Sequence, residues 1–189
     1  MARGKDQGKP AQILEAAFSV FGESGYQATL VKDIADRAGI SPGTIYTYFD
    51  DKLHLFRATA EEGWARFLEQ VRAVAASPEP AESRLSRFLD VGFQSLRQYL
   101  PLLRGMLFES SQMNIVQNGL EEFCAIVEHV LDERRRERGR QVVDGAERGP
   151  FLRLTVVGVL FSAAMAPQDN VGPVLEGLKR TVTLLAAGG

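Results

Sequence analysis

The sequence predicts an all-α protein, and three observations lead to this prediction. Apolar residues recur every three or four positions along most of the chain, which is the spacing of one face of a helix. Glycines and prolines stand mostly between these periodic segments, where they end or restart helices. No segment alternates apolar and polar residues between hairpin turns, so strands are not expected. The periodic segments predict about nine helices.

The first two helices are expected to be short and close together. Apolar residues between Ile13 and Phe21 form the first stripe, which the glycines of "GESGYQAT" interrupt. Thr29 is placed to cap the second helix with its hydroxyl. Gly39 follows the last apolar residue of that helix, where a left-handed glycine commonly ends a helix.

The third helix has the clearest start. Ser41 offers a hydroxyl cap, and Pro42 suits the first helical position because its missing N–H is not needed there. At ~100° per residue, Ile45 and Phe49 fall on one face and are expected to point into a core. The helix is expected to end near Phe49. Its remaining faces carry Gly43, Thr44, Tyr46, Thr47 and Tyr48.

Longer helices follow these three. Asp51 is expected to cap a fourth helix from Leu53 to Ala75, which the prolines of "ASPEPAES" end. Pro101 is expected to separate a fifth helix from a short sixth one, because proline removes a helical hydrogen bond. The fifth to ninth helices are expected at 85–99, 102–110, 116–131, 151–166 and 173–186.

Composition places the chain among soluble globular proteins. Hydrophobic residues make up 45% and charged residues 24% of its 189 residues, and the formal net charge is −2. Such a chain can bind nucleic acid only through a local patch. The single cysteine excludes an internal disulfide and suits a reducing compartment. Because the sequence shows no signal-peptide pattern and no apolar run of ~20 residues, we expect a cytoplasmic protein outside the membrane.

The exposed face expected for the third helix suits the major groove of DNA. A surface helix selected for solubility usually carries lysine and glutamate, whereas this one carries glycine, threonine and tyrosine. Hydroxyls can bond phosphates, a threonine methyl can touch a thymine methyl, and glycine permits close approach. The helix start at Ser41 offers amide donors, and Lys32 and Lys52 can contact further phosphates. The second and third helices therefore predict a helix-turn-helix.

The segment "TLVKDIADRAGISPGTIYTYFDDKLHLF" resembles the amino-terminal DNA-binding region of TetR/AcrR-type transcriptional regulators. The shared pattern covers roughly Gln12 to Ala58, and its elements match at fixed spacing. The resemblance implies that a three-helix head contacts DNA. The positions that it assigns to DNA contact are Thr29, Lys32, Ser41, Pro42, Gly43, Thr44, Tyr46, Thr47, Tyr48 and Lys52.

The resemblance also implies a domain organisation and a mode of action. We expect a flexible arm at 1–9, a helix-turn-helix DNA-binding domain at 10–56, and a ligand-binding and dimerisation domain at 57–189. A regulator of this type binds a near-palindromic operator as a homodimer and leaves the double-stranded DNA when a small molecule binds. The family favours a repressor, and the sequence leaves activation open.

The expected head is not net positive, which departs from a strongly basic DNA-binding surface. Seven basic residues between Met1 and Arg57 meet seven acidic ones. Phosphate contacts are therefore expected to rely on few charges and on neutral donors.

The segment "LTVVGVLFSAAMAP" is apolar on nearly every side. A helix of this kind must be covered on every side, either inside its own domain or by a second copy of the chain. The resembled family uses its last two helices for dimerisation, which favours the second copy. The expected interface residues are Val156, Val159, Leu160, Ala163, Val174, Leu178 and Val182.

Aromatic residues and methionines are frequent in the expected body. Each of them is individually best explained as plain core, but together they suit an apolar cavity for a hydrophobic, aliphatic or aromatic effector. The expected pocket residues are Trp64, Phe67, Phe88, Phe93, Met106, Met113 and Phe123.

An enzyme and a helical adaptor are the two alternatives to a regulator. An enzyme is not favoured, because the sequence shows no nucleophile with a base, no metal-ligand spacing and no phosphate-binding loop. No cofactor or metal is therefore expected. A helical adaptor that kept a helix-turn-helix without binding DNA remains an alternative.

Overall fold

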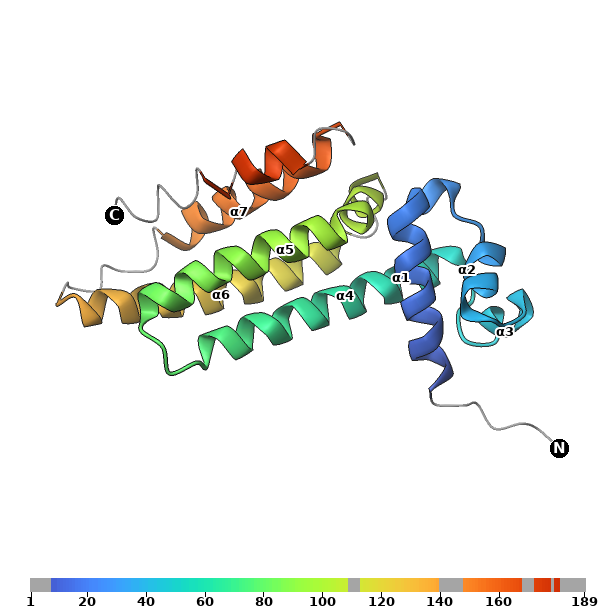
Figure 1. Ribbon diagram of the computed structural model, residues 1–189, viewed down its shortest axis with the longest axis horizontal. Coiled ribbons are helices and arrows are strands. Elements are labelled where there is room, and N and C mark those ends of the chain that lie inside the picture. The colour runs from blue at the N-terminus through green and yellow to red at the C-terminus, as the bar shows by residue number, and fades with distance from the viewer. Residues whose placement is uncertain (1–7, 109–112, 140–147, 168–171, 178, 181–189) are drawn as a thin grey trace. The chain divides into compact units, whose positions relative to one another are not determined.

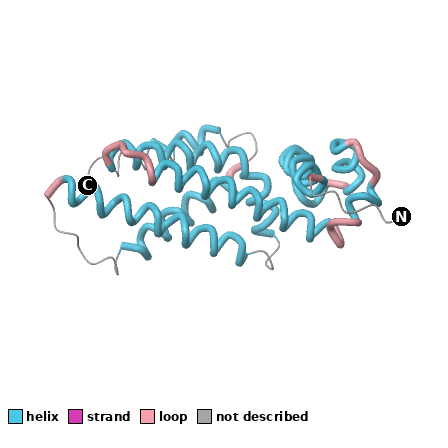
Figure 2. The backbone as a smooth tube through the Cα atoms, turned by 90° about the horizontal axis from the view of Figure 1, so that it is seen from below, coloured by secondary structure: helices cyan, strands magenta, loops and turns pink. Residues whose placement is uncertain are grey.

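Helices make up nearly all of the regular structure in the computed structural model of the protein. The structure describes residues 8–108, 113–139, 148–167, 172–177 and 179–180. Within these ranges there are helices and loops but no strand, as Figures 1 and 2 show. The predicted all-α fold is confirmed. No helix among these residues is both long and apolar enough to cross a membrane.

Contacts between residues divide the chain into two units. The head unit comprises Met1–Trp64 and Pro101–Met113, and the body unit comprises Ala65–Leu100 and Asn114–Gly189. Helix α4 (Lys52–Ala75) and helix α5 (Ala81–Phe108) contribute to both units. The predicted domain boundaries at 10–56 and 57–189 stay a prediction.

The head unit begins with three helices: α1 (Lys9–Ala28), α2 (Val31–Ala38) and α3 (Pro42–Tyr46). Helix α2 ends at Ala38, directly before Gly39 as predicted. Helix α1 runs further than predicted, and its irregularity lies at Gly25, whose φ of 74° is left-handed. A residue without a Cβ adopts that conformation without strain.

The turn between α2 and α3 is a Schellman motif. Gly39 has a φ of 64°, and its N–H is donated to the carbonyl of Asp36 at 3.2 Å. The N–H of Ile40 reaches back to the carbonyl of Ala35 at 3.0 Å. These two bonds satisfy carbonyls that the helix end leaves without partners. The predicted stop at Gly39 is confirmed.

An aromatic cluster closes the head unit around α4. The Phe56 ring lies 5.1 Å from that of Phe21 in an edge-to-face arrangement and 4.7 Å from that of Tyr26. Gly105 of α5 approaches the same rings, since a Cβ built on it would lie 2.8 Å from Phe56 Cζ and 3.1 Å from Tyr26 Cβ. Only glycine fits there without moving a ring.

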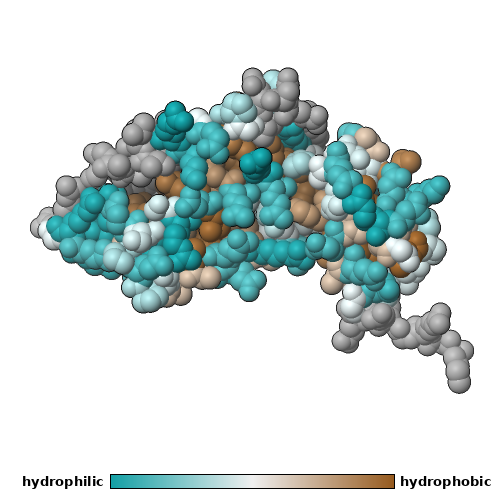
Figure 3. All heavy atoms as spheres, viewed as in Figure 1, coloured by the Kyte–Doolittle hydropathy of each residue, from teal (hydrophilic) through white to brown (hydrophobic). Residues whose placement is uncertain are grey.

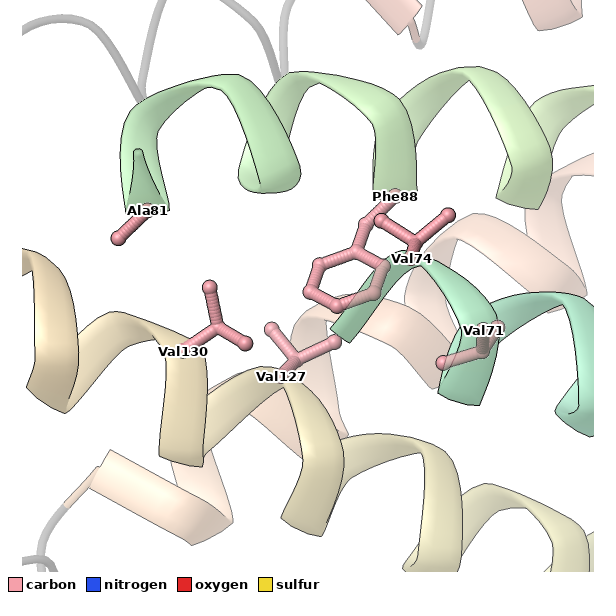
Figure 4. Close-up of a cluster of buried hydrophobic side chains, with 6 residues drawn as sticks. All are labelled: Val71, Val74, Ala81, Phe88, Val127 and Val130. Carbon is pink, nitrogen blue, oxygen red and sulfur yellow. The ribbon is translucent and has the colours of Figure 1, made fainter. Parts of the chain in front are cut away.

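The core of the body unit lies between α4, α5 and α6 (Met113–Glu137). Figure 4 shows its side chains pointing toward one another, with the Phe88 ring of α5 directed at valines of the other two helices. The buried cluster consists of Val71, Val74, Ala81, Phe88, Val127 and Val130. The body unit also contains α7 (Arg148–Met165) and a helical segment at 172–177.

Buried arginines hold the start of α5 to the end of α6. Arg84 is nearly buried, donates to the carbonyl of Ala75 at 2.8 Å and pairs with Glu133 at 2.6 Å. Arg134 is also buried and pairs with Glu82 at 2.5 Å. Because buried charges need partners, the loss of one member of such a pair costs more than the loss of a surface pair.

The predicted break at Pro101 is wrong, because α5 continues through this proline. Proline leaves the carbonyl four residues earlier without its helical partner. Leu100, Leu102 and Leu103 are all buried on either side of it. Their burial favours the continued helix and offsets the lost hydrogen bond. The fifth and sixth predicted helices are therefore one helix.

Candidate DNA-binding surface

Helix α3 is anchored on one face and exposed on the other. Ile45 and Phe49 are only 1% and 5% exposed, whereas Tyr46 is 52% exposed. The predicted inward face is confirmed. Burying the isoleucine and phenylalanine side chains contributes roughly 1.5–3 kcal/mol each, which a helix this short needs for stability. Serine, proline, glycine and threonine at positions 41, 42, 43 and 47 are exposed as well.

The hydroxyls near the start of α3 are already hydrogen-bonded within the head. Ser41 Oγ accepts the N–H of Thr44 at 3.2 Å, which confirms Ser41 as the cap of α3. The hydroxyl oxygens of Ser41 and Thr44 lie 2.9 Å apart. Because Pro42 has no N–H and the Thr44 N–H is used by this cap, the helix start offers fewer amide donors to a phosphate than predicted.

Helix α3 ends at Tyr46 and not near Phe49 as predicted. The N–H of Thr47 bonds the carbonyl of Thr44 at 3.2 Å, and the N–H of Tyr48 bonds that of Ile45 at 2.9 Å. These bonds span three residues, so the helix tightens as it ends. The Thr47 hydroxyl donates to the carbonyl of Gly43 at 3.1 Å.

Asp51 caps α4 as predicted. Its Oδ1 accepts the N–H of His54 at 2.7 Å. The loop after α3 is therefore fixed at both ends, by the buried Phe49 and by this cap.

Thr29 does not cap α2, because that position belongs to Leu30. The Thr29 side chain is 0% exposed, and its hydroxyl donates back to the carbonyl of Gly25 at 2.7 Å. Its N–H bonds the same carbonyl at 3.2 Å. Neither group is directed to solvent, so Thr29 holds the end of α1 and is left out of the surface that we propose for DNA.

Lys32 and Lys52, both predicted to contact phosphates, differ in their surroundings. Lys32 is exposed on α2, and no partner for it is seen in the described part of the chain. The Lys52 ammonium donates to the carbonyls of Tyr26 at 2.9 Å and Thr29 at 3.0 Å. It also lies 4.6 Å from the centre of the Tyr26 ring.

Arg37 is committed to holding α2 on α1. Its guanidinium forms two bonds with the Glu23 carboxylate, at 2.7 and 2.8 Å, and a further bond to Ser19. The bonds from Arg37 lower the pKa of Glu23, and those from Glu23 raise the pKa of Arg37. Arg37 and Lys52 are thus engaged inside the head, which leaves few cations for phosphates among its described residues.

The predicted pocket residues are scattered. Phe67, Phe88 and Phe123 lie together in the body, and the rings of Phe67 and Phe123 are 5.3 Å apart. Phe93 is half-buried in the same unit, while Trp64 belongs to the head unit. The side chains of Met106 and Met113 lie outside the described residues. The structure therefore brings three of these residues together, as part of the packed core.

The predicted dimer residues lie mainly on the covered side of α7. Val156, Val159 and Leu160 are half-buried, and Ala163 is buried within the chain. In the following segment Val174 is half-buried, and Leu178 and Val182 lie outside the described residues. The apolar residues that α7 exposes are Leu154, Val157, Phe161 and Met165.

This exposed set, which we call the α7 stripe, was missed by sequence reasoning. Its members are three or four residues apart and therefore share one face of the helix. Because α7 is apolar all round, the sequence offers no contrast between its sides. Figure 3 shows the usual pattern elsewhere, with polar side chains covering much of the face in view and apolar ones between them.

Two more features of the head had no role in the sequence prediction. Leu30 is a large exposed apolar side chain directly before α2. Tyr26 contacts Phe21, Phe56 and Lys52. The only sequence signal for this role is its position between a glycine and α2. Contacts over such sequence separations leave no local signal.

Cys124 is buried, and burial raises the pKa of its thiol to about 11. A thiol held in its protonated form is a poor nucleophile and a poor metal ligand. Among the described residues, no three His, Cys, Asp or Glu side chains are grouped as metal ligands would be.

Comparisons with known proteins agree with this geometry. Residues 13–59 match the family of bacterial regulatory proteins, tetR family. The chain is 32% identical over 101 residues to the uncharacterized HTH-type transcriptional regulator YfiR of Bacillus subtilis, covering 53% of this chain and 49% of that protein. It is 26% identical over 142 residues to the fatty acid metabolism regulator protein of the same organism, covering 60% of this chain and 73% of that protein.

Solved structures share the fold over nearly the whole chain. A transcriptional regulator from Cytophaga hutchinsonii matches with a TM-score of 0.83 at 21% identity, covering 96% of both chains. The regulator FadR from Bacillus subtilis, solved with stearoyl-CoA, matches with a TM-score of 0.66 at 23% identity, covering 89% of this chain and 96% of that one. The resemblance read from the sequence is confirmed: residues 13–59 match the tetR family, and the chain is similar to helix-turn-helix transcriptional regulators of the TetR type.

Proposed function

We propose that the chain is a ligand-responsive repressor that binds a near-palindromic operator as a homodimer and is released by a small apolar effector. The observation that carries this proposal is the exposed face of α3. Tyr46 and Thr47 are exposed to solvent, whereas Ile45 on the opposite side of the helix is buried. Tyrosine and threonine supply hydrogen bonds and apolar contact to base edges and phosphates.

The contact surface in this proposal is smaller than the set predicted from the sequence. It consists of Lys32 on α2 and of Ser41, Pro42, Gly43, Thr44, Tyr46, Thr47 and Tyr48 in and around α3. Thr29 is omitted because its side chain is buried. With few free cations, affinity would depend on neutral contacts more than in a basic DNA-binding protein.

The α7 stripe supports the homodimer. Four large apolar side chains exposed on one helix face are unusual in a monomer, and a second copy of the same helix would cover them. A palindromic operator would then match the two-fold symmetry of the dimer. The neighbouring segment at 172–177, with Val174, would extend this interface.

An effector with a long hydrocarbon chain is the class that we propose. The relatives include a fatty acid metabolism regulator, and FadR was solved with stearoyl-CoA. The effector would lie near Phe88 and Phe123 of the body and would shift α4, which runs without interruption from Lys52 to Ala75. A shift of α4 would change the separation of the two heads of a dimer.

Binding to DNA flanking the protein's own coding region tests the proposal. Fluorescence anisotropy would follow duplexes carrying inverted repeats at several stated salt concentrations. Specific binding is expected for one repeat, and stearoyl-CoA is expected to weaken it, with free coenzyme A as the control. Equal affinity for scrambled duplexes would contradict a regulator, and binding that ignores every acyl-CoA would contradict the effector class.

A paired variant separates the regulator from a helical adaptor. Thr44→Ala with Tyr46→Phe removes two hydroxyls while keeping the packing of α3. We expect at least ~10-fold weaker operator binding, since each good polar contact to DNA contributes roughly 1–3 kcal/mol of discrimination. An adaptor that does not use this face would lose nothing.

A further inference from the structure

The ammonium of Lys52 is fully engaged inside the head unit. It donates to the carbonyl oxygens of Tyr26 at 2.9 Å and Thr29 at 3.0 Å, and the carbonyl of Gln27 lies at 3.5 Å. A lysine ammonium has three donors and no acceptor. The three donors therefore face three carbonyls, and none is left for a phosphate in this arrangement.

The acceptors lie where α1 ends and the chain crosses to α2. Tyr26 and Gln27 are in the last turn of α1, after the left-handed Gly25, and Thr29 is the residue that caps this end. The last carbonyls of a helix have no partner within the helix, and its carboxyl end carries partial negative charge. A cation at this point satisfies both demands.

The lysine that supplies this cation starts another helix. Lys52 is the first residue of α4, close behind the recognition helix α3 and the buried Phe49. The positive end of a helix is a poor place for a cation unless the side chain reaches other acceptors. Its bonds to Tyr26 and Thr29 therefore close a loop of the chain that contains both α2 and α3.

The Tyr26 ring supports the same contact from the side. The Lys52 nitrogen lies 4.6 Å from the ring centre, within the range of a cation–π interaction. Tyr26 itself packs on Phe56 of α4, with the ring centres 4.7 Å apart. The lysine is thus held to the carboxyl end of α1 by hydrogen bonds and by a ring that is fixed in the core.

We propose that Lys52 is a positioning residue, which fastens the end of α1 to the start of α4 and so fixes how α3 is presented to DNA, and that it does not neutralise an operator phosphate. This inference rests on the proposed DNA binding for its functional half. It replaces the phosphate contact predicted for Lys52 from the sequence, while Lys32 keeps that assignment.

The salt dependence of DNA affinity distinguishes a positioning lysine from a phosphate ligand. Each phosphate that a protein neutralises adds about 0.9 to the slope of log affinity against log salt. Lys52→Met removes the charge and keeps a side chain of similar length, and Lys32→Met is the matched control. Operator affinity would be measured between about 50 and about 200 mM salt for both variants and for the wild type.

We expect Lys52→Met to bind roughly 10-fold more weakly with the slope unchanged, since charge-assisted hydrogen bonds to the carbonyls are lost. Lys32→Met should lower the slope by about 0.9. A slope that falls in Lys52→Met as it does in Lys32→Met overturns the proposal.

Thermal melting and hydrogen exchange without DNA test the structural half independently. Lys52→Met should melt about 4 °C lower, and amides of 26–30 should exchange faster. Lys32→Met should leave both unchanged. If Lys52→Met does not fold, Lys52→Gln replaces it in every measurement. Unaltered melting and exchange would overturn the proposal. If the wild-type protein binds no duplex, the proposed function is refuted, and the structural role of Lys52 is then decided by melting and exchange alone.

Discussion

Helices α3 and α7 both expose side chains that a solvated helix does not need, but the two sets differ in kind. Helix α3 presents hydroxyl-bearing residues such as Tyr46 and Thr47 above a buried isoleucine. Helix α7 presents Leu154 and Phe161, which offer hydrocarbon alone. A surface of hydroxyls suits a polar, hydrogen-bonding partner, whereas a surface of hydrocarbon suits another apolar surface.

The difference extends to what holds each exposed face in place. The α3 face is defined by its surroundings: the Gly39 turn before it, the Ser41 cap, the buried Phe49 and the Asp51 cap after it. The α7 stripe has no comparable turn or cap around it, and its residues are defined only by their exposure. On this comparison, α3 is a preformed contact surface, whereas the exposed apolar side of α7 is buried only when a partner binds.

The largest expected effect follows from placing a charge in the α7 stripe. Phe161 is 57% exposed, so Phe161→Glu should leave the monomer folded. In a dimer the carboxylate would be buried without a partner, and we expect the dimer to weaken by at least ~100-fold. Sedimentation velocity over a concentration series measures this change.

A charge of the same sign outside the stripe is the control for Phe161→Glu. Gln94 is exposed on α5, and Gln94→Glu should leave the association constant unchanged. A variant of Phe161 that associates like the wild type would break the comparison, because the stripe would then need another explanation.

The next effect concerns the exposed face of α3. Tyr46→Ala removes a half-exposed ring that contributes little to the core, so the melting temperature should change by no more than ~2 °C. Operator affinity should fall roughly 10- to 100-fold, the cost of one good contact to a base edge. Ile45→Ala on the opposite face should instead destabilise the head by about 2–5 kcal/mol. Similar melting losses in both variants would show that α3 has no free face.

A smaller effect compares two glycines of α5. A Cβ at Gly105 would lie 2.8 Å from Phe56 Cζ and 3.1 Å from Tyr26 Cβ, while nothing lies within 4 Å of one at Gly92. Gly105→Ala should therefore destabilise the protein by about 1–2 kcal/mol, after allowing for the better helix propensity of alanine. Gly92→Ala should stabilise it by up to about 1 kcal/mol. Denaturant titration measures both changes, and equal signs would refute the close contact with the head rings.

Local signals predicted the frame of α3, while contacts between distant residues decided the rest. The Ser41 cap, the Gly39 stop and the inward direction of Ile45 depend on neighbours within a few residues, and all were predicted. Thr29 was assigned to the wrong helix, because a threonine between two helices can bond either one. Its hydroxyl bonds the helix before it.

Two further features could not be read from local sequence. The role of Lys52 depends on carbonyls 23–26 residues away, which no local pattern reveals. The exposed side of α7 depends on which side the rest of the body covers, and a helix apolar all round gives no indication of it. At Pro101 the local signal was misleading. The proline predicted a helix end, but the helix continues because leucines on both sides of it are buried.

The smallest expected effect concerns the ion pair between Arg37 and Glu23. It tests whether a surface ion pair helps to hold α2 and α3 in place. Hydrogen bonds from Arg37 lower the pKa of Glu23. The pair therefore stabilises the folded state above the ordinary glutamate pKa of about 4.3, and this contribution is lost as the pH falls through the lower folded value. Because both side chains are about half exposed, Arg37→Gln should lower the melting temperature by no more than ~2 °C at pH 7. The difference from the wild type should shrink as the pH falls through the lowered pKa of Glu23 and vanish once Glu23 is protonated in both proteins. A large loss at pH 7, or one that persists in acid, would mean that Arg37 holds α2 and α3 through contacts other than this pair.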